Sequence, residues 1–123
     1  MTQPLALLHY EKLLPCSQLM HRLEDMGYRV QTVPEAGQLA AQAETTKPLL
    51  VIVDLDPGMR SACSAIADLQ RNAATSHIPV IAIAGEDQEE AQEAARQAGA
   101  KLVVHDHAIL AYLDQFLEQA LEI

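Results

Sequence analysis

The sequence lacks any apolar run that approaches the roughly 18 residues of a membrane-spanning helix. Its first ten residues, MTQPLALLHY, also lack the charged start and the cleavage site of a signal peptide. Both absences argue against a membrane or secreted protein, and the cytoplasm is the expected location. At 123 residues the chain is expected to form one domain, covering residues 1–123.

Basic residues are scarce as well. Lys and Arg number 8 against 17 Asp and Glu, which gives a formal net charge of −9. Because nucleic-acid binding depends on basic side chains that neutralise phosphates, we do not expect direct binding to nucleic acid. The acidic balance favours a protein that meets other proteins.

Cysteine and aromatic residues are few. The two cysteines, Cys16 and Cys63, form neither a CxxC pair nor a disulfide framework, so we expect both to be buried small apolar side chains. Aromatic residues make up 3% of the chain and apolar residues 50%, so the core is expected to consist of Leu, Ile, Val and Ala. Catalytic arrangements are missing too: we find no Gly-rich phosphate loop and no Ser-His-Asp order, and do not expect an enzyme.

Strand and helix patterns alternate five times along the chain. The predicted strands are residues 4–9, 29–33, 49–54, 79–84 and 101–105, and the predicted helices are residues 13–26, 35–45, 58–72, about 86–98 and 108–121. Gly27 and Gly99 are expected to end the helices that precede them. This α/β alternation predicts a flavodoxin-like, doubly wound five-stranded parallel sheet of order 2-1-3-4-5, with helices on both faces.

An acidic residue ends the most apolar predicted strand. Residues 49–56 read LLVIVDLD, and Asp54 lies at the carboxyl end of the strand, where open α/β sheets bind ligands. His9, His105 and His107 end or follow other strands at the same edge. They are expected to be ordinary surface histidines, although a metal site built from histidine and carboxylate remains an alternative.

Several segments, in this order and spacing, resemble the receiver domain of two-component response regulators (CheY-like). They are Asp54-Leu55, the loop Asp56-Pro57-Gly58-Met59, residues 69–83 (LQRNAATSHIPVIAI) and Ala98-Gly99-Ala100. The resemblance covers essentially the whole chain. It implies a role in signal transduction and makes Asp54 equivalent to the phosphoacceptor.

The same resemblance shows that the other parts of the phosphorylation switch are replaced. The acidic pair that holds Mg²⁺ matches His9-Tyr10-Glu11, in which Tyr10 is no acid and Glu11 supplies at most one. The hydroxyl position is Ala84, the aromatic switch position is Val103, and the lysine position is Asp106. We therefore expect a degenerate receiver, or pseudo-receiver, without a cofactor, which acts in phosphorelay signalling through phosphorylation-independent protein contacts.

The resemblance also implies a partner face, formed by the fourth helix, the fifth strand and the fifth helix. The residues expected on it are Gln92, Glu93, Arg96, Lys101, Tyr112, Gln115 and Glu118. A histidine kinase or an output protein is the expected partner, and a homodimer through this face is an alternative. We expect no attached output domain, so any effect passes through another chain.

Two other functions stay open. In one, Asp54 is an atypical phosphoacceptor and Glu11 and Asp56 hold Mg²⁺. In the other, the small residues Ala84 and Gly85 open the edge of the sheet to a small ligand or a metal. Flavin binding is not expected, because residues 11–15 (EKLLP) lack the glycines and hydroxyls of a phosphate loop.

Overall fold

The computed structural model describes residues 4–9, 16–33, 35–55, 59–85, 87–105 and 108–121. Strands and helices alternate along them. The strands are β1 (Leu5–His9), β2 (Arg29–Thr32), β3 (Leu50–Asp54), β4 (Val80–Ala84) and β5 (Leu102–His105). The helices are α1 (Cys16–Asp25), the 3-10 helix η1 (Ala36–Gln38), α2 (Leu39–Thr46), α3 (Met59–Arg71), α4 (Glu89–Ala98), α5 (Ala108–Ala111) and α6 (Leu113–Leu121). None of these described helices is long and apolar enough to span a bilayer.

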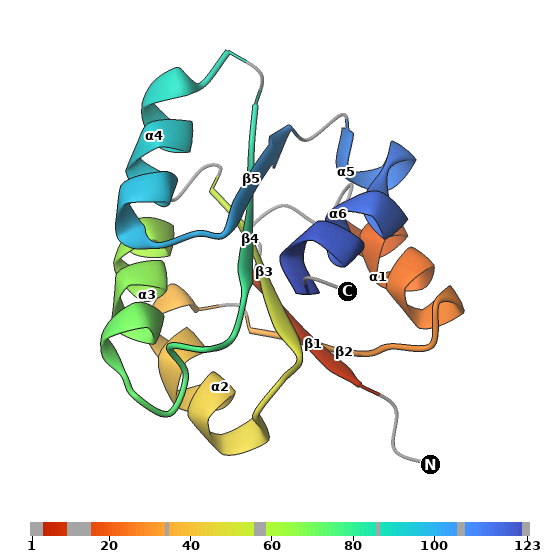
Figure 1. Ribbon diagram of the computed structural model, residues 1–123, viewed down its shortest axis with the longest axis horizontal. Helices are drawn as coiled ribbons and strands as arrows, with labels where there is room; N and C mark the ends of the chain where they lie inside the picture. The colour runs from red at the N-terminus through yellow and green to blue at the C-terminus, as the bar shows by residue number, and fades with distance from the viewer. Residues whose placement is uncertain are drawn as a thin grey trace.

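All five strands are parallel and lie in the order β2-β1-β3-β4-β5 (Figure 1). This confirms the predicted doubly wound sheet. Strands β1, β3 and β4 are buried along their whole length, because helices cover both faces of a parallel sheet. Their near-continuous apolar sequences follow from this burial.

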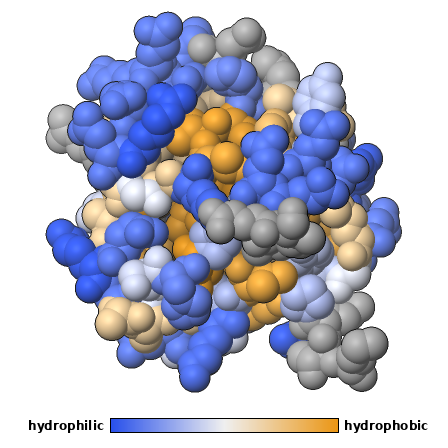
Figure 2. Space-filling model, in the orientation of Figure 1, coloured by the Kyte–Doolittle hydropathy of each residue, from blue (hydrophilic) through white to orange (hydrophobic). Residues whose placement is uncertain are grey.

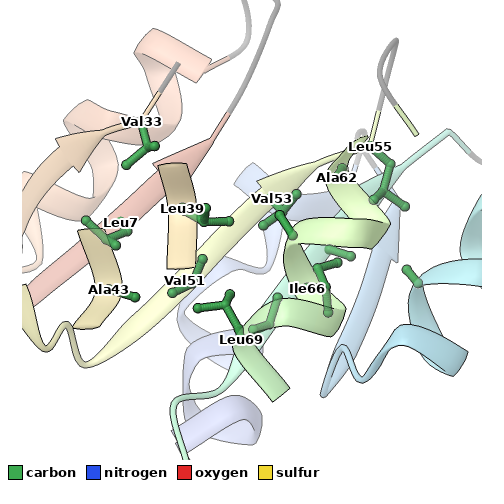
Figure 3. Close-up of a cluster of buried hydrophobic side chains, with 14 of the residues drawn as sticks. Leu7, Val33, Leu39, Ala43, Val51, Val53, Leu55, Ala62, Ile66 and Leu69 are labelled. Atoms are coloured by element: carbon green, nitrogen blue, oxygen red, sulfur yellow. The ribbon is translucent and has the colours of Figure 1, made fainter. Parts of the chain in front are cut away.

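Two hydrophobic clusters, one on each face of the sheet, form the core. Helices α2, α3 and α4 cover one face, and α1, α5 and α6 cover the other (Figure 1). Side chains of β3 alternate between the clusters: Val51 and Val53 pack under α2 and α3, whereas Leu50 and Ile52 pack on the opposite face. Figure 3 shows the first cluster, in which Ile66 and Leu69 of α3 lie against the sheet.

Glycine ends two helices as predicted. Gly27 and Gly99 have φ values of +94° and +119°, in the left-handed region that glycine adopts at little steric cost. The N–H of Gly99 donates to the carbonyl oxygens of Ala95 and Arg96, which closes the last turn of α4.

Two predicted helices differ from the structure. The helix predicted over 108–121 is interrupted at Tyr112, where α5 ends and α6 follows. The hydrophobic pattern did not mark this interruption, because Ile109, Leu113 and Leu117 are buried at helical spacing on both sides of it. The helix predicted over 35–45 begins as the 3-10 helix η1, so α2 starts only at Leu39.

Cys63 is free and only half-buried, packed against the core on α3. It is therefore less buried than the sequence suggested. Partial burial nevertheless raises the pKa of its thiol above the ordinary 9.0, so the neutral thiol prevails at neutral pH. The side chain of Cys16 lies outside the described residues.

Candidate functional site

Asp54 is the last residue of β3 and lies at the carboxyl edge of the sheet, between the ends of β1 and β4. It pairs with Ile83 of β4, and its neighbour Val53 pairs with His9 of β1. The N–H of Leu55 donates to the carbonyl oxygen of Ile83 at 2.9 Å, so the pairing continues past the carboxylate. Asp54 is 8% exposed, which places its side chain in the rim of the sheet rather than in open solvent.

His9 is buried at the end of β1, with 1% of its surface exposed. The expectation of a surface histidine is therefore wrong for this residue. Strand β1 lies between β2 and β3, so even its last side chain is covered. Its Nδ1 lies 2.7 Å from the carbonyl oxygen of Val33, just beyond β2. Because a carbonyl only accepts hydrogen bonds, Nδ1 carries the proton.

His105 ends β5 and is exposed, as expected. It pairs with Ala84 across the β4–β5 ladder, and strands β3 and β4 lie between it and His9 of β1. Among the described residues, no three His, Cys, Asp or Glu side chains lie close enough together to hold a metal ion.

Ala84 ends β4, next to the residue that pairs with Asp54, and Gly85 follows it. Ala84 is 1% exposed and carries no hydroxyl. The N–H of Gly85 donates to Oε1 of Gln88 at 2.7 Å. The carbonyl oxygen of Gly85 accepts from the N–H of Gln88 at 3.0 Å and from Nε2 of Gln92 at 2.9 Å. Both main-chain groups of Gly85 are thus occupied by residues at the start of α4.

Gln92 is buried, with 9% exposure, because its side chain turns back toward Gly85. The expectation that Gln92 presents its side chain on the partner face is therefore wrong. Sequence reasoning also missed Gln88. The signal was a pair of glutamines four residues apart near the start of the predicted helix that follows Ala84-Gly85, a spacing that puts both on one helix face.

The rest of the expected partner face is exposed. Its described members are Glu93, Arg96, Lys101, Tyr112, Gln115 and Glu118. The rings of Tyr112 and Phe116 meet edge to face with their centroids 6.4 Å apart. Figure 2 shows apolar surface where β5 lies in Figure 1, with polar side chains on either side. Leu102 and Val103 of β5 are half-buried there, and Val103 also packs against the first core cluster.

Five residues that the sequence assigned to the rim lie outside the described residues. They are Tyr10, Glu11, Asp56, Asp106 and His107. The described part of the site is therefore Asp54 with His9, Ala84 and Gly85, together with the two glutamines that hold Gly85.

Solved structures that resemble this chain include receiver domains and response regulators. A candidate response regulator from Chloroflexus aurantiacus is 18% identical to this chain, with a TM-score of 0.88 over 99% of this chain and 100% of that one. The receiver domain of a sensor histidine kinase from Pseudomonas aeruginosa, with a magnesium ion coordinated in its active-site cleft, is 20% identical, with a TM-score of 0.87 over 99% and 100%. A chemotaxis response regulator from Vibrio cholerae is 17% identical, with a TM-score of 0.78 over 93% and 98%.

No protein-family model matches the chain, and no curated protein matches its sequence. At this level of identity, structural similarity establishes the arrangement of the chain and leaves its chemistry to be argued from its own residues. The comparisons therefore show that this chain has the CheY-like receiver fold.

Proposed function

We propose that this chain is a receiver-type signalling module that binds a partner protein without being phosphorylated. The observation that carries the proposal is the end of β4. Ala84 offers no hydroxyl, and the N–H of the next residue, Gly85, already donates to Gln88. A phosphoryl group on Asp54 would find no free hydrogen-bond donor on these two residues, where the resemblance implies one.

Charge supports the same conclusion. A phosphoryl group carries about −1.5 to −2 charges at neutral pH, and this chain already has a formal net charge of −9. Phosphoryl transfer depends on positioning and on stabilising that charge. At the rim, His9 is committed through Nδ1 to Val33, and the sequence has Asp106 in place of the lysine that the resemblance implies.

The partner face supports a role in protein contacts. It combines the exposed ring of Tyr112, 52% accessible, with half-buried apolar residues of β5 and charged side chains of α4. Interface cores are enriched in aromatic residues, and their rims are polar. We propose a signalling protein as the partner, either a histidine kinase or an output protein, with a homodimer as the competing occupant.

A second candidate function is an atypical phosphoacceptor. The observations in its favour are that Asp54 ends the central strand β3 and that one similar receiver domain coordinates magnesium in its active-site cleft. Glu11 and Asp56 supply the further oxygen ligands in this version.

Intact-mass spectrometry after incubation with acetyl phosphate and Mg²⁺ separates the two functions. We expect no adduct. A mass increase of one phosphoryl group that Asp54→Asn abolishes would contradict the proposal and establish the second candidate. A melting temperature that rises with one metabolite or metal ion, without an adduct, would instead support a sensor at the rim, since ligands of the native state stabilise it.

A further inference from the structure

We infer that Gln88 and Gln92 hold the turn between β4 and α4 in one conformation, and that this pair acts as a built-in lock on the position of α4. The pair and its target Gly85 are called the glutamine clasp below. Any role of the clasp in signalling rests on the proposed function. The clasp itself is tested separately, by amide exchange.

The clasp makes three hydrogen bonds to a single residue. Gly85 donates its N–H to Oε1 of Gln88 at 2.7 Å and accepts from Gln88 N–H at 3.0 Å and from Gln92 Nε2 at 2.9 Å. The N–H of Gln92 also donates to the carbonyl oxygen of Gln88 at 3.0 Å, which joins the two glutamines through the first turn of the helix.

The two side chains have complementary tasks. Gln88 supplies an acceptor for the N–H of Gly85, and Gln92 supplies a donor for its carbonyl oxygen. Gln88 precedes α4 at the N-cap position, yet its side chain caps no N–H of its own helix. Gln92 lies one turn further and points back toward the helix start, as helical side chains do. Its burial, with 9% exposure, makes the bond to Gly85 costly to break.

A side chain at position 85 would crowd the side chains of Gln88 and Asp87. A Cβ at position 85 would lie 3.1 Å from Oε1 of Gln88 and 3.1 Å from Oδ1 of Asp87. A side chain there would therefore press on the clasp itself. The absence of a side chain lets Gln88 approach the main chain closely.

The clasp lies directly after the position where the resemblance implies a hydroxyl. Ala84 has none, and the turn that follows it is held by groups belonging to α4. The first turn of α4 is consequently held to this turn by uncharged amide groups. The exposed side of α4, with Glu93 and Arg96, is thereby presented in one arrangement.

One substitution made at three glutamines tests the clasp. Gln88→Glu keeps an acceptor for the N–H of Gly85, so hydrogen exchange of that amide should stay within about twofold of the parent protein. Gln92→Glu replaces the donor by a second acceptor facing the carbonyl oxygen, and exchange at Gly85 should become about fivefold faster or more. Gln97→Glu adds the same charge to an exposed residue of the same helix and should change nothing at Gly85.

Amide exchange is read residue by residue by NMR. Equal exchange at Gly85 in all three variants and the parent would overturn the inference. If Gln92→Glu does not fold, Gln88→Leu takes its place, because it removes the acceptor from a half-buried position and should also accelerate exchange at Gly85.

The outcome is separable from that of the proposed function. A phosphoryl adduct on Asp54, with slow amide exchange still seen at Gly85, would contradict the proposed phosphorylation independence but not the clasp. Fast amide exchange at Gly85, in a protein that takes up no phosphoryl group, would contradict only the clasp.

Discussion

Thr75 is a single residue that satisfies a buried main-chain group, as His9 does at the rim. It lies in the loop between α3 and β4, is fully buried, and donates its hydroxyl to the carbonyl oxygen of Leu69 at 2.7 Å. That carbonyl belongs to the last turn of α3, where carbonyl oxygens lack the N–H donors that a continuing helix would supply. A side-chain donor therefore ends the helix and shapes the loop at once.

Thr75→Val should lower the free energy of unfolding by about 1–2 kcal/mol, because it keeps the shape and leaves the Leu69 carbonyl without this donor. Thr45 provides the matched control. It makes a similar bond, to Ala41 at 3.0 Å, but on the exposed side of α2. Thr45→Val should change stability by no more than about 0.5 kcal/mol. Urea denaturation measures the change in the free energy of unfolding for both variants. Equal changes would show that burial does not decide how much each threonine hydrogen bond contributes to stability.

Helix α4 shows what decides the placement of an element. It packs on the sheet through Ala91 and Ala95, whose small side chains allow a close approach, and it ends at Gly99. A Cβ at Gly99 would lie 2.9 Å from Cδ of Gln70 and closer still to its Cγ, so the end of α4 meets α3 without room for a side chain.

Gly99→Ala should destabilise the fold by about 2–4 kcal/mol, because it combines a strained positive φ with a clash against Gln70. Gly37→Ala is the control: no atom lies within 4 Å of the added Cβ, and its φ is not in the left-handed region. It should be neutral or stabilising by up to about 1 kcal/mol. Thermal unfolding compares them, and Gly99→Ala combined with Gln70→Ala should recover part of the loss. If stability does not recover in the double variant, the whole loss comes from the strained φ at position 99.

The sequence predicted elements better than it predicted the directions of side chains. The run LLVIVDLD indicated a buried parallel strand with Asp54 at its end, and the structure has β3 there. Periodicity could not reveal that Gln92 turns inward to Gly85, because glutamine at that position is compatible with either direction. The burial of His9 also depended on its neighbours, since only the strand order and the position of Val33 supply its cover and its acceptor.

At the scale of the whole molecule, the rim and the partner face are distinct regions joined by α4. The clasp lies at the first turn of the helix, and the exposed residues Glu93 and Arg96 follow it. Asp54 lies on the rim and Tyr112 on the partner face. The proposed function therefore assigns different consequences to substitutions in the two regions.

Capture of partners from a lysate of the source organism should survive Asp54→Asn and fall at least about tenfold with Tyr112→Ala, as expected for an aromatic residue at an interface core. Leu49→Ala is the control, since Leu49 is a similarly exposed apolar residue, 43% accessible, at the amino end of β3. Quantitative mass spectrometry measures the captured proteins. Loss of binding with Asp54→Asn alone would place the determinant on the rim instead.

The occupied main-chain groups of Gly85 have a consequence for how information passes through such a protein. Under the proposed function, a domain whose helix α4 is held in one position has no separate active and inactive forms. The fraction of partner molecules that it binds then depends on its own concentration relative to the Kd of the complex. Synthesis and degradation of the protein would then control signalling, because the amount of protein sets the fraction of partner that is bound.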